Sequence, residues 1–161
     1  KPLPWSAGEV LRGTQEEAAS LVLADNELQV EVGRQAAERA VPLAGPEWVS
    51  ELLAHVVALS AMAVHEESRA AEIDGLYAAL AQHLPPPGAV EAWSSRADLD
   101  TRLAYQPVFH RGARIVLAKD GRKAARTLLK WPASHGGQLH QGDLLKRYPD
   151  LGPWLAGSVA H

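Results

Sequence analysis

The feature that most constrains the fold is the apolar run from Leu52 to Val64, which is interrupted by His55. In a helix, this run places apolar side chains in nearly every direction around the axis, and such a helix is buried on most sides. The run is too short to cross a bilayer, and the amino-terminal residues lack the charged and then apolar order of a signal segment. We therefore expect Leu52–Val64 to form the core helix of a cytoplasmic protein that does not associate with membranes.

A long helix is predicted before this core helix. Thr14, with Glu17 three residues later, forms the pattern of a capping box, and we expect the helix to continue towards Val41. The segment Leu28–Val32 alternates apolar and polar residues as a strand does, but Leu21, Leu28 and Val32 also fall on one face at the helical period. We favour the helix.

The helical pattern resumes at Glu47 and extends to Leu84, with a bend or a restart expected near Gly75. The run Pro85–Gly88 then ends it, because consecutive prolines cannot continue a helix. This run divides the sequence into an acidic helical body at residues 1–88 and a smaller helical unit at residues 89–161. The two parts are either one continuous domain or two lobes.

The smaller unit has helical patterns over Ala89–Tyr105, Arg122–Trp131 and Gln141–Tyr148. Between the first two patterns, Arg114–Ala118 is a short apolar run with β-branched members, which predicts a strand within a β-hairpin at residues 108–118. The expected fold class is mainly α, a helical bundle-like domain whose carboxy-terminal unit contains at most this hairpin.

Charge is distributed unevenly along the chain. Residues 1–110 contain seven Lys or Arg and sixteen Asp or Glu, a net charge of −9, whereas residues 111–161 contain nine and three, a net charge of +6. A basic carboxy-terminal third can meet an anionic partner, although a basic patch that only balances the acidic body is the alternative.

Seven basic side chains of this third are the candidate contact residues for nucleic acid. In the helix expected from Arg122, the basic positions fall on one side at the helical period, where they can follow a phosphate backbone. The ordinary solvated face of an amphipathic helix has the same appearance, so both interpretations stay open. The set is Lys119, Arg122, Lys123, Arg126, Lys130, Lys146 and Arg147.

The order of a helix, a Gly-containing turn, a second helix and a further segment after Pro149 resembles the winged-helix superfamily over residues 111–161. The segment in the position of the recognition helix, Asp150–Ser158, contains two glycines and a proline. It has none of the Arg, Asn or Gln side chains that usually contact base edges. We therefore expect contacts to the phosphate backbone and no sequence readout.

The alternative hypothesis is a metal site on the core helix. Glu51, His55 and Glu66 share one face at the helical period, and carboxylates and imidazoles are common metal ligands. Glu27 and Glu31 are candidates for completing the site. The Glu-x-x-His spacing of di-metal bundles is absent, and surface glutamates beside a half-buried histidine explain the same residues, so we expect no cofactor.

Enzymatic signatures are absent from the sequence. There is no cysteine, which excludes disulfides and thiol catalysis, and neither a Gly-x-Ser-x-Gly motif nor a phosphate-binding glycine motif occurs. We expect a non-enzymatic regulatory or assembly module that binds protein and, through its basic unit, nucleic acid or another anionic partner; the alternative is a helical metal-dependent enzyme or metal-binding protein. The apolar surface of Leu52–Val64 and two partial apolar faces of the amino-terminal helix also predict a homodimer formed by helices.

Overall fold

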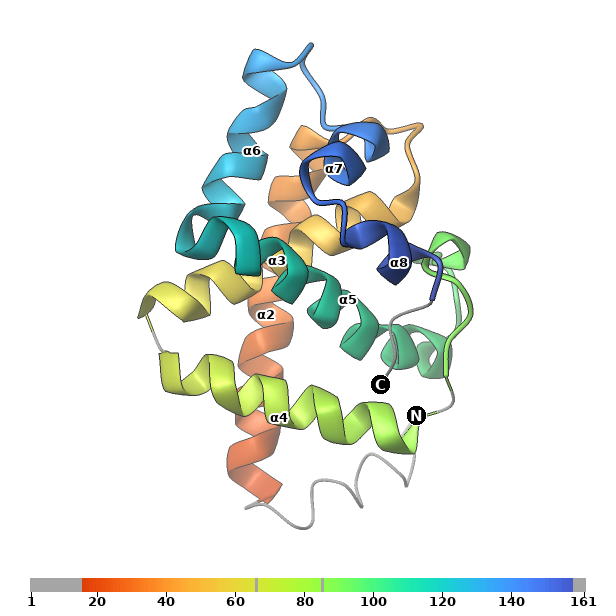
Figure 1. The fold of residues 1–161 in the computed structure, drawn as a ribbon. Helices are drawn as coiled ribbons and strands as arrows, with labels where there is room; N and C mark the ends of the chain where they lie inside the picture. Colours follow the sequence, from red (N-terminus) through yellow and green to blue (C-terminus); the bar gives the residue numbers. More distant parts are fainter. Residues whose placement is uncertain (1–15, 66, 85, 158–161) are drawn as a thin grey trace.

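The computed structural model describes the backbone of residues 16–65, 67–84 and 86–157, which is mainly helical (Figure 1). The helices and the two short 3-10 helices, in chain order, are α2 (Glu16–Ala40), α3 (Glu47–His65), α4 (Glu67–His83), η1 (Val90–Ala92), α5 (Leu99–Asp120), η2 (Gly121–Lys123), α6 (Ala124–Ser134), α7 (Gln141–Arg147) and α8 (Leu151–Leu155).

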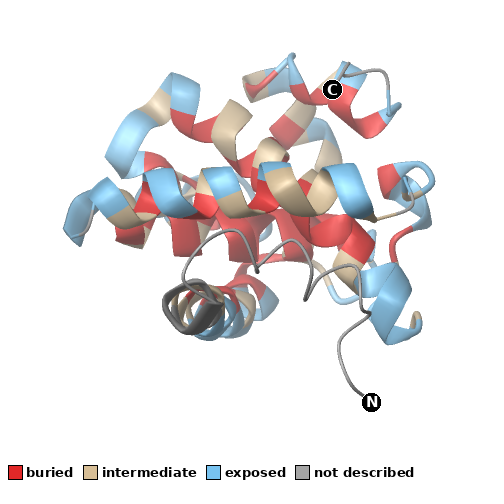
Figure 2. Ribbon diagram, turned by 90° about the horizontal axis from the view of Figure 1, so that it is seen from below, coloured by how far each residue is buried: buried red, intermediate tan, exposed pale blue. Residues whose placement is uncertain are grey.

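Helix α3 is the core helix that the sequence predicts. It packs against α2, α4, α5 and α6, and Leu52, Leu53, Val56 and Leu59 are almost completely buried. Figure 2 shows buried residues on the inward sides of the helices and exposed residues on their outer sides. Helix α3 is also long and apolar enough to cross a membrane. However, 67% of its most apolar 18-residue stretch is buried inside the molecule. Burial in the core accounts for its composition.

Helix α2 crosses α3 at very short range. A Cβ atom at Gly33 would lie 2.5 Å from the carbonyl oxygen of Ala54, so only glycine allows the two backbones to approach this closely. Val30 and Ala58 pack beside this crossing as a small buried cluster. The expected amino-terminal helix is confirmed by α2, while Thr14, the first residue of the predicted capping box, lies outside the described residues.

The break within the second helical region lies elsewhere than expected. The region forms two helices, with α3 ending at His65 and α4 beginning at Glu67, whereas Gly75 lies inside α4. Nothing lies within 4 Å of a Cβ atom built at Gly75, so this glycine stands at an open surface position. An isolated glycine there costs helix stability without stopping the helix.

The predicted β-hairpin at residues 108–118 is wrong, because these residues lie inside α5 and the described part of the chain contains no strand. Asp98 caps α5 by accepting a hydrogen bond from the backbone N–H of Thr101 at 2.9 Å. The helix continues through Pro107, although an interior proline removes one backbone hydrogen bond. Phe109, Ala113 and Val116 are completely buried in the core. Tertiary packing therefore overrides the β preference of the branched residues.

After α5 the chain forms short helices, of which α6 and α8 pack against α5. Leu151, Trp154 and Leu155 of α8 are buried, and the indole Nε1 of Trp154 donates a hydrogen bond to the carbonyl of Val108 at 2.8 Å. The segment that the winged-helix resemblance places in the recognition position therefore packs inward. The main hydrophobic cluster draws on residues from both sides of the Pro85–Gly88 run.

Candidate functional site

A basic surface lies on the outer side of η2 and α6. It consists of Arg122, Lys123, Arg126 and Lys130, and all four residues are exposed. Ala124 and Leu128, on the opposite side of α6, are buried at 0% and 1% exposure. The helical spacing predicted from the sequence therefore separates the charged side of α6 from its packed side. Arg122 forms an ion pair with Glu67, which is itself highly exposed, at 3.8 Å.

Two of the seven predicted contact residues are engaged in internal interactions. The Arg147 guanidinium pairs with Asp120, with Nη2 and Oδ1 2.9 Å apart, and its Cζ atom lies 5.4 Å from the centroid of the Trp131 ring. The Lys119 ammonium donates a hydrogen bond to the Arg147 carbonyl. These side chains hold α7 against the end of α5. Lys146, the remaining candidate, is exposed on α7.

Asp120, at the end of α5, connects this helix to α7. Its side chain makes no capping hydrogen bond to η2. Its carboxylate instead accepts hydrogen bonds from Arg147 and from the Tyr148 hydroxyl. Burial and the neighbouring Asp120 carboxylate raise the pKa of Tyr148, so this hydroxyl remains a proton donor at neutral pH.

The histidine-containing turn before α7 is a structural element. The His135 ring stacks on Trp131 with 3.9 Å between centroids and 8° between planes. The backbone N–H of Leu139 donates a hydrogen bond to the carbonyl of Ala40 at 2.9 Å, which ties the turn to the end of α2. Since His135 and Arg147 both lie against the Trp131 ring, this ring is not a free stacking platform for a base.

The structure brings together two of the three predicted metal ligands. His55 Nε2 and Glu51 Oε1 lie 3.5 Å apart, but Arg34 also contacts Glu51, donating from Nε and Nη2 at 3.2 and 3.0 Å. Glu66 lies outside the described residues. Within the part of the chain that the structure describes, no group of three or more His, Asp or Glu side chains is arranged to hold a metal ion.

The carboxylates near His55 have opposite pKa shifts. Burial on its own raises the pKa of Glu51, but His55 and Arg34 outweigh burial and lower the pKa to about 2. The pKa of Glu27, whose side chain is exposed, is raised, because desolvation by the surrounding residues outweighs the effects of His55 and Arg34. Glu51 is therefore an ionised partner of a partly buried ion pair. This cluster stabilises the packing of α2 on α3.

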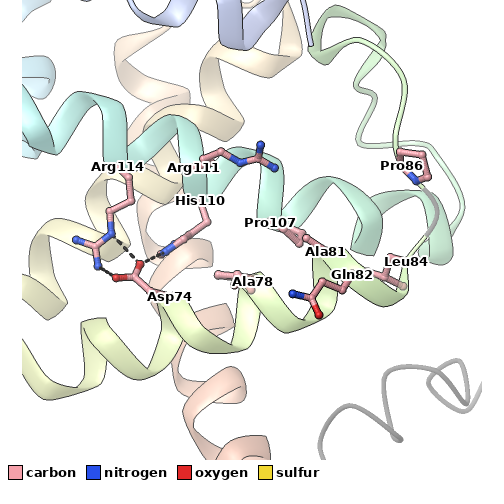
Figure 3. A pocket seen from close by; sticks show the side chains of 11 residues that line it. Asp74, Ala78, Ala81, Gln82, Leu84, Pro86, Pro107, His110, Arg111 and Arg114 are labelled. Carbon is pink, nitrogen blue, oxygen red and sulfur yellow. Dashed lines mark hydrogen bonds and ion pairs between the residues drawn. The ribbon is translucent and has the colours of Figure 1, made fainter. Parts of the chain in front are cut away.

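A pocket that the sequence did not predict lies between α4 and α5, with a volume of about 630 Å³. Asp74, His110 and Arg114 lie at one end of the pocket, and Leu84 and Pro86 lie at the other (Figure 3). Asp74 is 36 residues from His110 and 40 from Arg114 along the chain. No local sequence pattern links positions so far apart. His110 and Arg114 have helical spacing, but the prediction of a strand at Arg114–Ala118 did not place them on one helix.

The polar end of this pocket is a connected group. Oδ1 of Asp74 lies 2.6 Å from His110 Nε2 and 2.7 Å from Arg114 Nε, and Oδ2 pairs with Arg114 Nη2. Partial burial raises the pKa of Asp74, but His110 and Arg114 outweigh it and lower the pKa below its ordinary value. For His110, burial is dominant and lowers the pKa, and Asp74 offsets only part of the effect. At neutral pH the group combines a carboxylate, a guanidinium and a neutral imidazole.

Comparison with known proteins places this chain in no family. No protein-family model, no curated protein and no solved structure matches it. Functional inference therefore depends on the geometry of the chain itself.

Proposed function

We propose that this protein is a non-enzymatic binding module whose basic surface contacts nucleic acid or another polyanion without reading its sequence. The observation that carries the proposal is the exposure of Arg126 and Lys130 on one side of α6, opposite the buried Ala124 and Leu128. Cations at helical spacing can each neutralise a phosphate and release condensed counterions. Arg122 and Lys123 extend the basic surface onto η2.

The basic surface is not expected to contact bases, because Arg147, Lys119 and Trp131 are engaged in internal interactions. Arg147 and Trp131 support the packing of α7, so neither is offered to a base edge or to a stacking base. Contacts from the exposed Lys and Arg side chains position a polyanion but carry no sequence information. We therefore expect the protein to bind a polyanion in a salt-dependent manner and with low sequence preference.

A matched pair of double variants tests this proposal. The test variant is Arg126→Ala with Lys130→Ala, and the control is Arg96→Ala with Arg102→Ala, which removes two exposed arginines from the acidic part of the chain. Fluorescence anisotropy with labelled duplexes of two unrelated sequences measures affinity across a salt series. We expect the test variant to lose at least ~10-fold in affinity and the slope of log K against log salt to fall by about 2.

The control should retain most of the wild-type affinity and slope. Equal losses in both variants would mean that net charge alone is responsible, and retention of wild-type binding by the test variant would remove the basic surface from the proposal. Absence of wild-type binding to either duplex at low salt would exclude duplex DNA as the polyanion.

Self-association is a separate part of the proposal. Of the two surfaces that predicted a homodimer, the apolar surface of α3 is mostly buried within the chain. Leu28 and Val32 of α2 are instead 60% and 54% exposed, four residues apart on the outer side of the helix. A second copy of the chain that packs against this pair would bury both side chains.

A further inference from the structure

We propose that the pocket between α4 and α5 binds a small, largely apolar molecule that donates one hydrogen bond, from a hydroxyl or an N–H group, to Nδ1 of His110. This inference does not depend on the basic surface, which lies on α6 and η2. The pocket is a second binding site of the chain, and its lining indicates the chemical class of the ligand.

The walls of the pocket favour an apolar ligand. Ala78 and Ala81 of α4 face Pro107 of α5 across the pocket, and Leu84 and Pro86 close its far end (Figure 3). The small side chains leave room between the two helices. A volume of about 630 Å³ is within the range of roughly 300–1,000 Å³ that small-molecule sites occupy.

The polar end of the pocket fixes the protonation of His110. Asp74 is held as a carboxylate by Arg114, so it can only accept a hydrogen bond, and Nε2 of His110 must donate to its Oδ1 atom at 2.6 Å. A neutral imidazole carries one hydrogen, so Nδ1 has none and presents a lone pair. His110 is 6% exposed, and among the described residues Nδ1 has no hydrogen-bond partner in the structure.

The Nδ1 lone pair of His110 is a hydrogen-bond acceptor, so it favours a ligand that carries a donor. A ligand hydroxyl that reaches Nδ1 gives this lone pair a hydrogen-bond donor, while the apolar body of the ligand displaces water from the walls. A ligand cation would face the guanidinium groups of Arg111 and Arg114, which line the same pocket. A ligand anion would be attracted by these guanidinium groups and repelled by the Asp74 carboxylate, and it could donate to His110 only through a separate hydroxyl or N–H group. The polar end therefore selects for a donor group.

Two probes that differ in one hydrogen-bond donor test this assignment. β-Naphthol has an aromatic body and one hydroxyl donor, and β-methoxynaphthalene keeps the body but cannot donate. Calorimetric titration of the full chain should give about tenfold tighter binding of β-naphthol, the value of one hydrogen bond. Nitrogen NMR of the histidine rings should show the His110 Nδ1 signal moving on addition of β-naphthol and staying in place with its ether.

Two variants separate the hydrogen bond from the cavity. His110→Phe keeps an aromatic ring but removes the acceptor, and we expect it to bind the two probes equally. Ala81→Trp fills the pocket and should abolish binding of both. If His110→Phe fails to fold, the wild-type comparison of the two probes and the NMR signal still decide the question. Equal affinity of the wild type for both probes, no detectable binding of β-naphthol, or unchanged binding by Ala81→Trp would overturn the proposal.

Discussion

The indole ring of Trp154 lies directly against the backbone of Gly112, so that a Cβ atom at position 112 would lie 2.6 Å from its Cζ2 atom. The ring is held in place by the hydrogen bond from its Nε1 atom to Val108 and by edge-on contacts with Trp48 and Phe109. A side chain at position 112 would therefore displace α8 from α5. Gly112 is the point at which the carboxy-terminal helix docks on the core.

Gly112→Ala should lower the free energy of unfolding by about 1–3 kcal/mol, the usual cost of overpacking a core. Its matched control is Gly75→Ala in α4, where nothing lies within 4 Å of the added Cβ atom. The control should raise stability by about 0.5–1 kcal/mol, because alanine favours a helix more than glycine does. Chemical denaturation measures both, and equal stability changes in the two variants would contradict the close packing of Trp154.

Arg147→Ala should destabilise the fold by about 2 kcal/mol, because it removes charge-assisted hydrogen bonds to the largely buried Asp120 carboxylate and uncovers the Trp131 ring. Lys146→Ala, at the adjacent exposed position, should change stability by less than about 0.5 kcal/mol. Thermal unfolding followed by circular dichroism compares the two. If both variants unfold at the wild-type temperature, Arg147 is a surface cation and returns to the set of candidate contact residues.

Glu51 should make the protein acid-sensitive. Its pKa is lowered in the folded state from an ordinary 4.5 to about 2, so its contribution is complete above about pH 5 and is lost as pH falls towards 2. The contribution corresponds to about 3 kcal/mol at neutral pH. Glu51→Gln should lose roughly this amount at pH 7 and nothing at about pH 2. The raised pKa of Glu27 acts in the opposite direction.

The difference in unfolding free energy between wild type and Glu51→Gln isolates the Glu51 contribution, because Glu27 is present in both proteins. Urea denaturation at a series of pH values between about 2 and 7 measures it. A difference that does not change across this range would show that the ion pair with Arg34 contributes nothing that depends on pH.

If Leu28 and Val32 form the contact between two copies, Leu28→Gln with Val32→Thr should shift the protein towards monomer without changing its stability by more than about 1 kcal/mol, because both residues are exposed in the single chain. Analytical ultracentrifugation at increasing concentration measures the change. A wild-type protein that remains monomeric at high micromolar concentration would end the proposal of a homodimer.

The sequence by itself determined the helical class and the core helix. Apolar residues in all directions over Leu52–Val64 require burial on most sides, and α3 has that environment. The side of α6 that carries Arg126 and Lys130 also followed from spacing alone, because a helix converts sequence separation directly into direction. These features depend on residues within one element, so local periodicity is sufficient to predict them.

Only the tertiary structure decided the features that depend on contacts between elements. The apolar run at Arg114–Ala118 fits a strand by composition, but packing of α5 against α3 and α4 makes it helical. The exclusion of Arg147 from the basic surface depends on Asp120, and the pocket depends on Asp74 meeting His110 and Arg114 across two helices. Such pairs are created by the relative placement of helices, which is set by the summed packing of the core and leaves no local pattern in the sequence.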